Sequence, residues 1–135
     1  MTPAVIPGVG LLDTSVVIDL PILSPDDLPT FPTISAVTLA ELSVGPHVTS
    51  DALVQAQRQL VLQEAEASFD PLPFDAACAR RFALVASALR KDGRKSRARA
   101  FDALIAATAL ALDLPLYTRN AQDFAGITDL VVRAV

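Results

Sequence analysis

The sequence contains one cysteine, one histidine and no tryptophan among its 135 residues. With Cys78 as the single cysteine, an internal disulfide is excluded, and such sparse cysteine usage is typical of a reducing cytoplasm. A catalytic thiol needs a nearby base, and the only histidine, His47, follows a Gly–Pro pair in an expected loop. The sequence therefore does not predict a cysteine–histidine nucleophile, and Cys78 is expected in the core.

We expect neither a signal peptide nor a membrane anchor in this sequence. The N-terminal stretch MTPAVIPGVGLL has no basic region and no small-residue cleavage site. The very apolar stretch 102–114 is too short to span a bilayer and carries Asp102 and Asp113. We expect a soluble cytoplasmic protein that does not bind membranes.

The composition is that of one well-packed domain. Apolar residues make up 52% of the sequence and charged residues 19%, so intrinsic disorder is not expected. No internal repeat, low-complexity tract or linker divides the chain. A single domain over residues 1–135 is predicted.

The net charge of −4 hides a strongly uneven distribution. Eight of the 11 basic residues lie in one stretch, which we call the basic block: Arg80, Arg81, Arg90, Lys91, Arg94, Lys95, Arg97 and Arg99. Only Asp92 opposes them there, so this stretch carries +7 and the remainder −11. Such a block can bind a phosphate backbone, or it can be a solvated helix end and loop, and composition alone leaves both open.

Short β-like runs alternate with helical ones along the chain. Strands are expected at 9–13, 33–36, 69–74, 115–119 and 130–135, and helices at 14–20, 37–45, 50–67, 75–91 and 99–114, with a helical turn from Asn120. Thr14 and Ser15 are expected to cap the first helix, and Asp75 a later one. This alternation predicts an α/β fold with a mainly parallel sheet, in which ligands bind beyond the carboxyl ends of the strands.

Two acidic residues stand at positions that packing does not explain. Asp13 follows the first strand directly, at the edge where ligands bind. Glu41 shares a helical face with Val37 and Val44, where an unpaired carboxylate is costly to bury. The structural alternative for Glu41 is a boundary residue that reaches water.

Two further acids lie in the last third of the chain. Asp102 begins the apolar segment DALIAATALAL, where a carboxylate in the first turn would also suit the helix dipole. Asp123 follows Asn120 by three residues, a spacing that a capping box would explain equally well. Each acid singly can be structural, but the four together predict one acidic pocket.

Four carboxylates in one pocket need a cation, because their mutual repulsion otherwise raises their pKa values or opens the site. Oxygen ligands without histidine or cysteine favour Mg²⁺ or Mn²⁺ over Zn²⁺. An acidic cluster that holds such ions beside a basic surface is typical of phosphodiester chemistry, in which the metal activates water and neutralises the phosphate.

The segments LLDTSVVIDL, ISAVTLAELSVG, RAFDALIAATALALDLPLYTRNAQDF and LVVRAV together resemble a PIN domain, and specifically a VapC-type toxin ribonuclease. The resemblance runs nearly end to end, although residues 46–75 carry no family signature. Asp13, Glu41, Asp102 and Asp123 match the family's four acids, and Ser15 and Asn120 match polar residues that often line the pocket. The resemblance implies a three-layer α/β/α sandwich.

The resemblance also implies a Mg²⁺-dependent endoribonuclease that forms homodimers and is neutralised by a cognate VapB antitoxin. On this interpretation Asp13 and Asp102 are the main metal ligands, and Glu41 and Asp123 complete the catalytic pocket. Ser15 and Asn120 orient these ligands or the phosphate. The RNA would be bound by four residues of the basic block: Arg94, Lys95, Arg97 and Arg99. The amphipathic segment 50–67 offers an apolar face to a partner helix, or packs on its own sheet.

Two other functions compete with this one. A small phosphatase or phosphoacceptor domain would carry covalent phosphate on Asp13, but the DTS motif lacks the second aspartate that such phosphatases use. A PIN-like interaction module without catalysis is the other alternative, and an intact set of four acids opposes it. A metal-dependent cleavage assay separates these functions.

Overall fold

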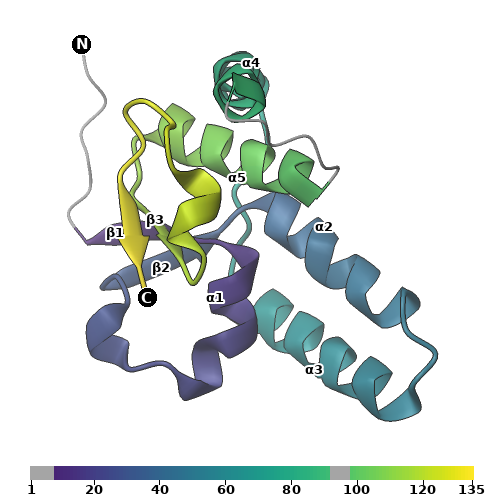
Figure 1. Ribbon diagram of the computed structural model, residues 1–135. Coiled ribbons are helices and arrows are strands. Elements are labelled where there is room, and N and C mark those ends of the chain that lie inside the picture. The colour runs from purple at the N-terminus through teal and green to yellow at the C-terminus, as the bar shows by residue number, and fades with distance from the viewer. Residues whose placement is uncertain (1–7, 92–97) are drawn as a thin grey trace.

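A four-stranded parallel sheet forms the centre of the computed structural model, which describes residues 8–91 and 98–135 (Figure 1). The strands are β1 (Val9–Leu12), β2 (Phe31–Ile34), β3 (Leu116–Thr118) and β4 (Val132–Ala134), in the order β2–β1–β3–β4. All neighbouring pairs are parallel. The predicted parallel sheet is confirmed, except that the expected strand at 69–74 contributes only an isolated bridge between Leu72 and Ser35.

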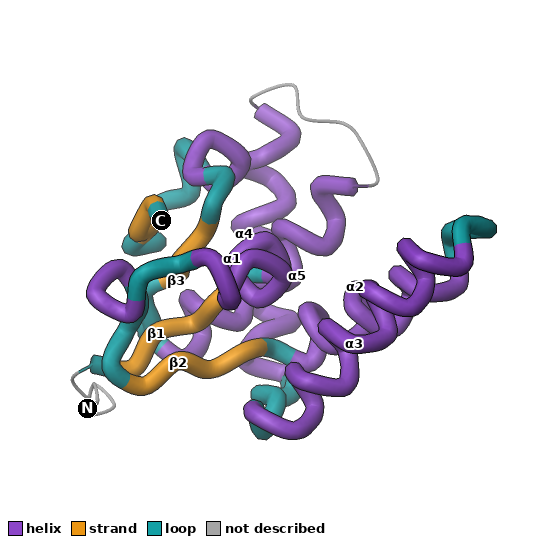
Figure 2. The backbone as a smooth tube through the Cα atoms, turned by 90° about the horizontal axis from the view of Figure 1, so that it is seen from below, coloured by secondary structure: helices purple, strands orange, loops and turns teal. Residues whose placement is uncertain are grey.

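The described residues form five α-helices around the sheet. They are α1 (Thr14–Asp19), α2 (Ala36–Val44), α3 (Ala52–Ser68), α4 (Ala76–Lys91) and α5 (Ala98–Leu112). Helices α4 and α5 lie on one side of the sheet, and α1 and α3 lie on the other (Figures 1 and 2). The predicted α/β/α sandwich is therefore confirmed.

The alternation of side chains along β1 divides the core in two. Leu11 packs in a cluster with residues of α4 and α5, whereas Leu12 packs in a second cluster with residues of α1 and α3. This follows from the pleat, which sends successive side chains to opposite faces. Gly10 has no room for a side chain, since an added Cβ would lie 2.5 Å from Cε1 of Tyr117. Both clusters fix the carboxyl end of β1 between the layers.

The N-caps of α1 and α4 differ in how well the sequence predicted them. Asp13, and not Thr14 or Ser15, caps α1, because its side chain accepts from the amide of Val16. The hydroxyl groups of Thr14 and Ser15 bind other side chains instead. Asp75 caps α4 as expected, since its carboxylate accepts from the amide of Cys78 at 3.1 Å.

Helices α2 and α3 form an antiparallel pair that extends away from the sheet (Figures 1 and 2). Val61 and Leu62 of α3 pack against the second core cluster, while Leu53 and Leu60 are 69% and 54% exposed. The packing expected for segment 50–67 is therefore confirmed for one side of α3, whereas the docking of a partner helix on the exposed side stays a prediction. Across residues 8–91 and 98–135, none of the helices has the length and apolar character needed to cross a bilayer.

Candidate metal and phosphate site

The four acids identified in the sequence meet at the carboxyl end of the sheet. Asp13 follows β1, Glu41 lies on α2, Asp102 lies on α5, and Asp123 lies on the turn Ala121–Phe124 after β3. Burial raises the pKa of Asp102, and the charges of Asp123 and Asp13 raise it further. Burial also raises the pKa of Glu41, with added repulsion from Asp102 and Asp13. The charges of the four carboxylates therefore act on one another through Asp102 and Glu41.

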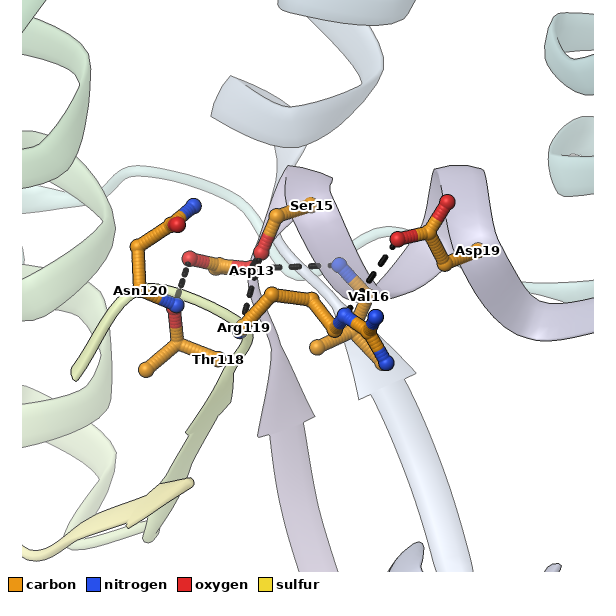
Figure 3. A network of polar contacts seen from close by, with 7 residues as sticks. All are labelled: Asp13, Ser15, Val16, Asp19, Thr118, Arg119 and Asn120. Atoms are coloured by element: carbon orange, nitrogen blue, oxygen red, sulfur yellow. Dashed lines mark hydrogen bonds and ion pairs between the residues drawn. The ribbon is translucent and has the colours of Figure 1, made fainter. Parts of the chain in front are cut away.

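Asp13 is held by hydrogen bonds from two neighbouring strand ends (Figure 3). Its Oδ1 accepts from the Ser15 hydroxyl at 2.5 Å and from the Val16 amide at 3.3 Å. Its Oδ2 accepts from the Thr118 hydroxyl at 2.6 Å. The residue is only 5% exposed, so these bonds compensate much of the cost of burying the carboxylate and hold it in one orientation.

The same network connects the loop after β3 to the loop after β1. The Ser15 hydroxyl accepts from the Arg119 amide at 3.1 Å, and the Thr118 hydroxyl accepts from the Asn120 amide at 3.0 Å. Of the two polar residues expected to support the pocket, Ser15 bonds Asp13 directly. Asn120 joins through its main-chain amide.

Sequence analysis did not single out Thr118 as a site residue. Leu12 and Tyr117 are paired in the sheet, so Asp13 and Thr118 stand one step beyond this pair. The signal that would have found Thr118 is its place at the end of a short apolar strand. Thr14 also binds a pocket acid, because its hydroxyl donates to Glu41 Oε1 at 2.7 Å, although the sequence indicated only a cap there.

Asp102 and Asp123 are joined by one arginine. Arg99 Nη1 lies 3.2 Å from Asp102 Oδ2 and 2.8 Å from Asp123 Oδ1. Helix α5 begins at Ala98, so Asp102 does not lie in its first turn and the helix-dipole explanation is wrong. Asn120 does stand at the N-cap position of the turn Ala121–Phe124 and Asp123 in its first turn, as a capping box requires, but the Asn120 side chain makes no capping hydrogen bond.

The basic block can be placed only in part. Arg80, Arg81 and Arg90 are exposed on α4. Arg94, Lys95 and Arg97, which were predicted to bind RNA, lie outside the described residues. Arg99 is described, and it contacts the acidic pocket.

The chemistry of the donor set fits a hard divalent cation. The pocket offers carboxylate oxygens with hydroxyl groups behind them, and the raised pKa values of Glu41 and Asp102 reflect burial and an excess of negative charge. Within the described residues, no three acidic, histidine or cysteine side chains form a group ready to hold an ion as they stand. The positive charge that Arg99 places between Asp102 and Asp123 already offsets part of their repulsion.

Comparison with known proteins agrees with this architecture. The PIN domain model matches residues 11–129. Ribonuclease VapC5 of Mycobacterium tuberculosis (strain ATCC 25618 / H37Rv) is 38% identical over 128 residues, which cover 90% of this chain and 89% of the relative.

Solved structures show the same fold. The structure of VapBC-5 from Mycobacterium tuberculosis, a member of the VapBC family of toxin–antitoxin systems, matches with a TM-score of 0.76 and 31% identity, covering 96% of this chain and 100% of that one. VapBC-1 from nontypeable Haemophilus influenzae matches with a TM-score of 0.70 and 26% identity, over 93% and 97% of the two chains. With a family match over most of its length and this identity to a ribonuclease, the chain belongs to the PIN domain family and is a relative of the VapC ribonucleases.

Proposed function

We propose that this protein is a metal-dependent endoribonuclease that acts as the toxin of a toxin–antitoxin pair. The observation that carries the proposal is the meeting of four carboxylates at one sheet edge, in a chain 38% identical to Ribonuclease VapC5. Burial raises the pKa values of Glu41 and Asp102, and neighbouring carboxylates raise them further, although Thr14 bonds Glu41 and Arg99 pairs with Asp102. Such a pocket is suited to a cation.

Asp13 and Asp102 would hold a Mg²⁺ or Mn²⁺ ion directly, with Glu41 and Asp123 completing the pocket through water or a second ion. When bound, the ion supplies charge for the phosphate and an activated water for attack. Ser15 and Thr118 hold the Asp13 carboxylate in place.

Other side chains support this site. The Thr14 hydroxyl fixes Glu41 in the same way that Ser15 and Thr118 fix Asp13. Asn120 lies beside this network and is proposed to orient a metal ligand or the phosphate. We also propose that the RNA lies along the basic block, where Arg94, Lys95 and Arg97 bind the phosphate backbone of the RNA.

The proposed protein partner is a VapB-type antitoxin, as in the VapBC systems that this structure resembles. A groove of about 530 Å³ beside the pocket supports this partner. Its lining is apolar along α1, α2 and α3 and reaches the acids at one end: Thr14, Ile18, Glu41, Leu42, Val44, Gly45, Val48, Val54, Gln57, Arg58 and Val61. An amphipathic segment in this groove would cover the approach to Glu41. Homodimerisation is proposed from the family resemblance, and light scattering of the purified chain measures it.

A cleavage assay with matched variants tests the proposal. The purified protein should cut RNA with Mg²⁺ or Mn²⁺, stop on addition of a chelator, and lose cleavage in Asp102→Asn. Asp113→Asn is the control, because Asp113 is exposed just beyond the other end of α5 and its positive φ of 55° suits asparagine. If the Asp102→Asn protein is folded and cleaves like the parent, the proposal is wrong.

Each rival function has its own result. A folded protein that binds partners without cutting RNA under any metal condition would be an interaction module. Covalent phosphate recovered on Asp13 would indicate a phosphoacceptor domain. The antitoxin proposal is tested by co-expressing the chain with the small protein encoded beside it, and it fails if this neighbour neither binds the chain nor restores growth.

A further inference from the structure

Arg99 is placed where a cation would be expected to bind. One nitrogen, Nη1, contacts both Asp102 and Asp123, at 3.2 and 2.8 Å. The three side chains are 34%, 22% and 29% exposed, so solvent still reaches the contacts. One nitrogen of a cationic group that contacts two carboxylates holds them together much as a divalent ion does.

The backbone keeps Arg99 at this position. It precedes Asp102 by three residues in α5, so both side chains lie on the same face of the helix. Asp123 comes from the turn after β3, which the sheet carries to the same edge. The guanidinium therefore remains beside the pocket even when its ion pairs open.

We propose that Arg99 is the internal counter-ion of the acidic pocket, which a divalent cation displaces from Asp102 and Asp123, freeing the guanidinium to bind the RNA phosphate. This inference rests on the proposed metal-dependent function. A divalent ion carries twice the charge of Arg99 and takes several oxygens at once. A guanidinium is well suited to phosphate, because its donors form a planar fork that matches two oxygens.

The proposal couples two binding events through one side chain. Without the two Arg99 ion pairs, the divalent ion binds more tightly, because it no longer has to break these pairs or stand beside the positive charge of Arg99. With the ion bound, Arg99 can turn to a phosphate at the same edge. A purely structural ion pair predicts the opposite for the metal, since its loss would loosen the pocket and weaken the site.

The experiment is a calorimetric titration of Mn²⁺ into the chelator-treated full chain. Arg99→Gln should bind Mn²⁺ about three- to tenfold more tightly than the parent, as expected for losing two partly exposed ion pairs. Arg133→Gln is the control, because Arg133 is exposed on β4 outside the basic block, and it should bind Mn²⁺ like the parent. Arg99→Lys keeps the charge and should fall between the parent and Arg99→Gln.

Melting curves in chelator and with Mn²⁺ provide a second readout. Arg99→Gln should melt earlier in chelator and gain more from Mn²⁺ than the parent does. If Arg99→Gln does not fold, the Mn²⁺ titration of Arg99→Lys tests the inference, and this variant should bind Mn²⁺ more tightly than the parent.

Equal or weaker Mn²⁺ binding by the Arg99 variants, in a parent that binds Mn²⁺ and cuts RNA, overturns this inference alone. A parent that neither binds Mn²⁺ nor cuts RNA overturns the proposed function as well.

Discussion

Replacing Thr118 with valine removes one hydroxyl from the support of Asp13 while nearly preserving the volume of the side chain. Thr118 is fully buried, and its hydroxyl donates to Asp13 Oδ2 at 2.6 Å. The Thr118 hydroxyl oxygen also accepts a hydrogen bond from the amide of Asn120 at 3.0 Å. Valine offers neither group, so one oxygen of a nearly buried carboxylate loses its hydrogen bond.

The cost follows mainly from the charged partner. A hydrogen bond to a charged group contributes about 1.5–3 kcal/mol, and the freed carboxylate oxygen has little access to water. The Asn120 amide adds little, because Asn120 is exposed and water can replace the hydroxyl. We expect the free energy of unfolding to fall by about 2 kcal/mol and cleavage to fall about 10–100-fold, as for other groups that orient a metal ligand.

Thr108→Val is the matched control. Thr108 is also fully buried, but its hydroxyl donates to the Leu104 carbonyl within α5, at 2.9 Å. Urea unfolding and RNA cleavage are measured for both variants, with Mn²⁺ affinity as a third readout. Thr108→Val should keep its Mn²⁺ affinity and cleavage rate. If Thr118→Val loses stability yet cuts RNA and binds Mn²⁺ like the parent, Thr118 supports the fold and does not position Asp13.

Three further predictions concern charge. Glu41→Gln should reduce RNA cleavage, while the protein in chelator should resist urea unfolding as well as the parent or better. Glutamine can still accept the hydrogen bond of the Thr14 hydroxyl, and the change removes a carboxylate whose pKa burial raises. A large loss of stability would contradict this. Reversing the charges of Arg94, Lys95 and Arg97 should reduce the slope of log binding constant against log salt concentration for RNA by about 0.7 per lost phosphate contact. An unchanged slope would mean that these three residues do not contact the RNA phosphates. Burial raises the pKa of Cys78 above its ordinary 9.0, so above that pH the unfolded thiol ionises first and stability should fall as pH rises. Urea unfolding of Cys78→Ala should show less of this fall.

Much of the fold could be predicted because its signals are local. The buried strands read as apolar runs, and Asp13 follows the first of them directly. The rule that parallel strands present their carboxyl ends at one edge then indicated where the acids would meet. The wrong prediction of a strand at 69–74 has the same cause, because it also rested on a local pattern. It is extended, but it pairs with the sheet through one bridge, which no local pattern distinguishes from a strand.

The supporting groups of the site depend on pairings that sequence spacing does not reveal. Thr118 is 105 positions from Asp13, and the two meet because β1 pairs with β3 and not only with β2. In the sequence, Thr14 and Ser15 were two hydroxyl residues that could cap the first helix. Once Asp13 takes the cap, Ser15 binds Asp13 and Thr14 binds Glu41.

Arg99 shows how a correct pattern can conceal a second role. Its position in a block of eight basic residues favoured phosphate binding, and its spacing from Asp102 was visible in the sequence. Asp123, however, reaches Arg99 only because β3 lies beside β1 and the turn after it faces the start of α5. The tertiary contact does not exclude phosphate binding. On the proposal made above, that binding follows the binding of a divalent cation, since the cation replaces the guanidinium between the two carboxylates and the guanidinium then turns to a phosphate.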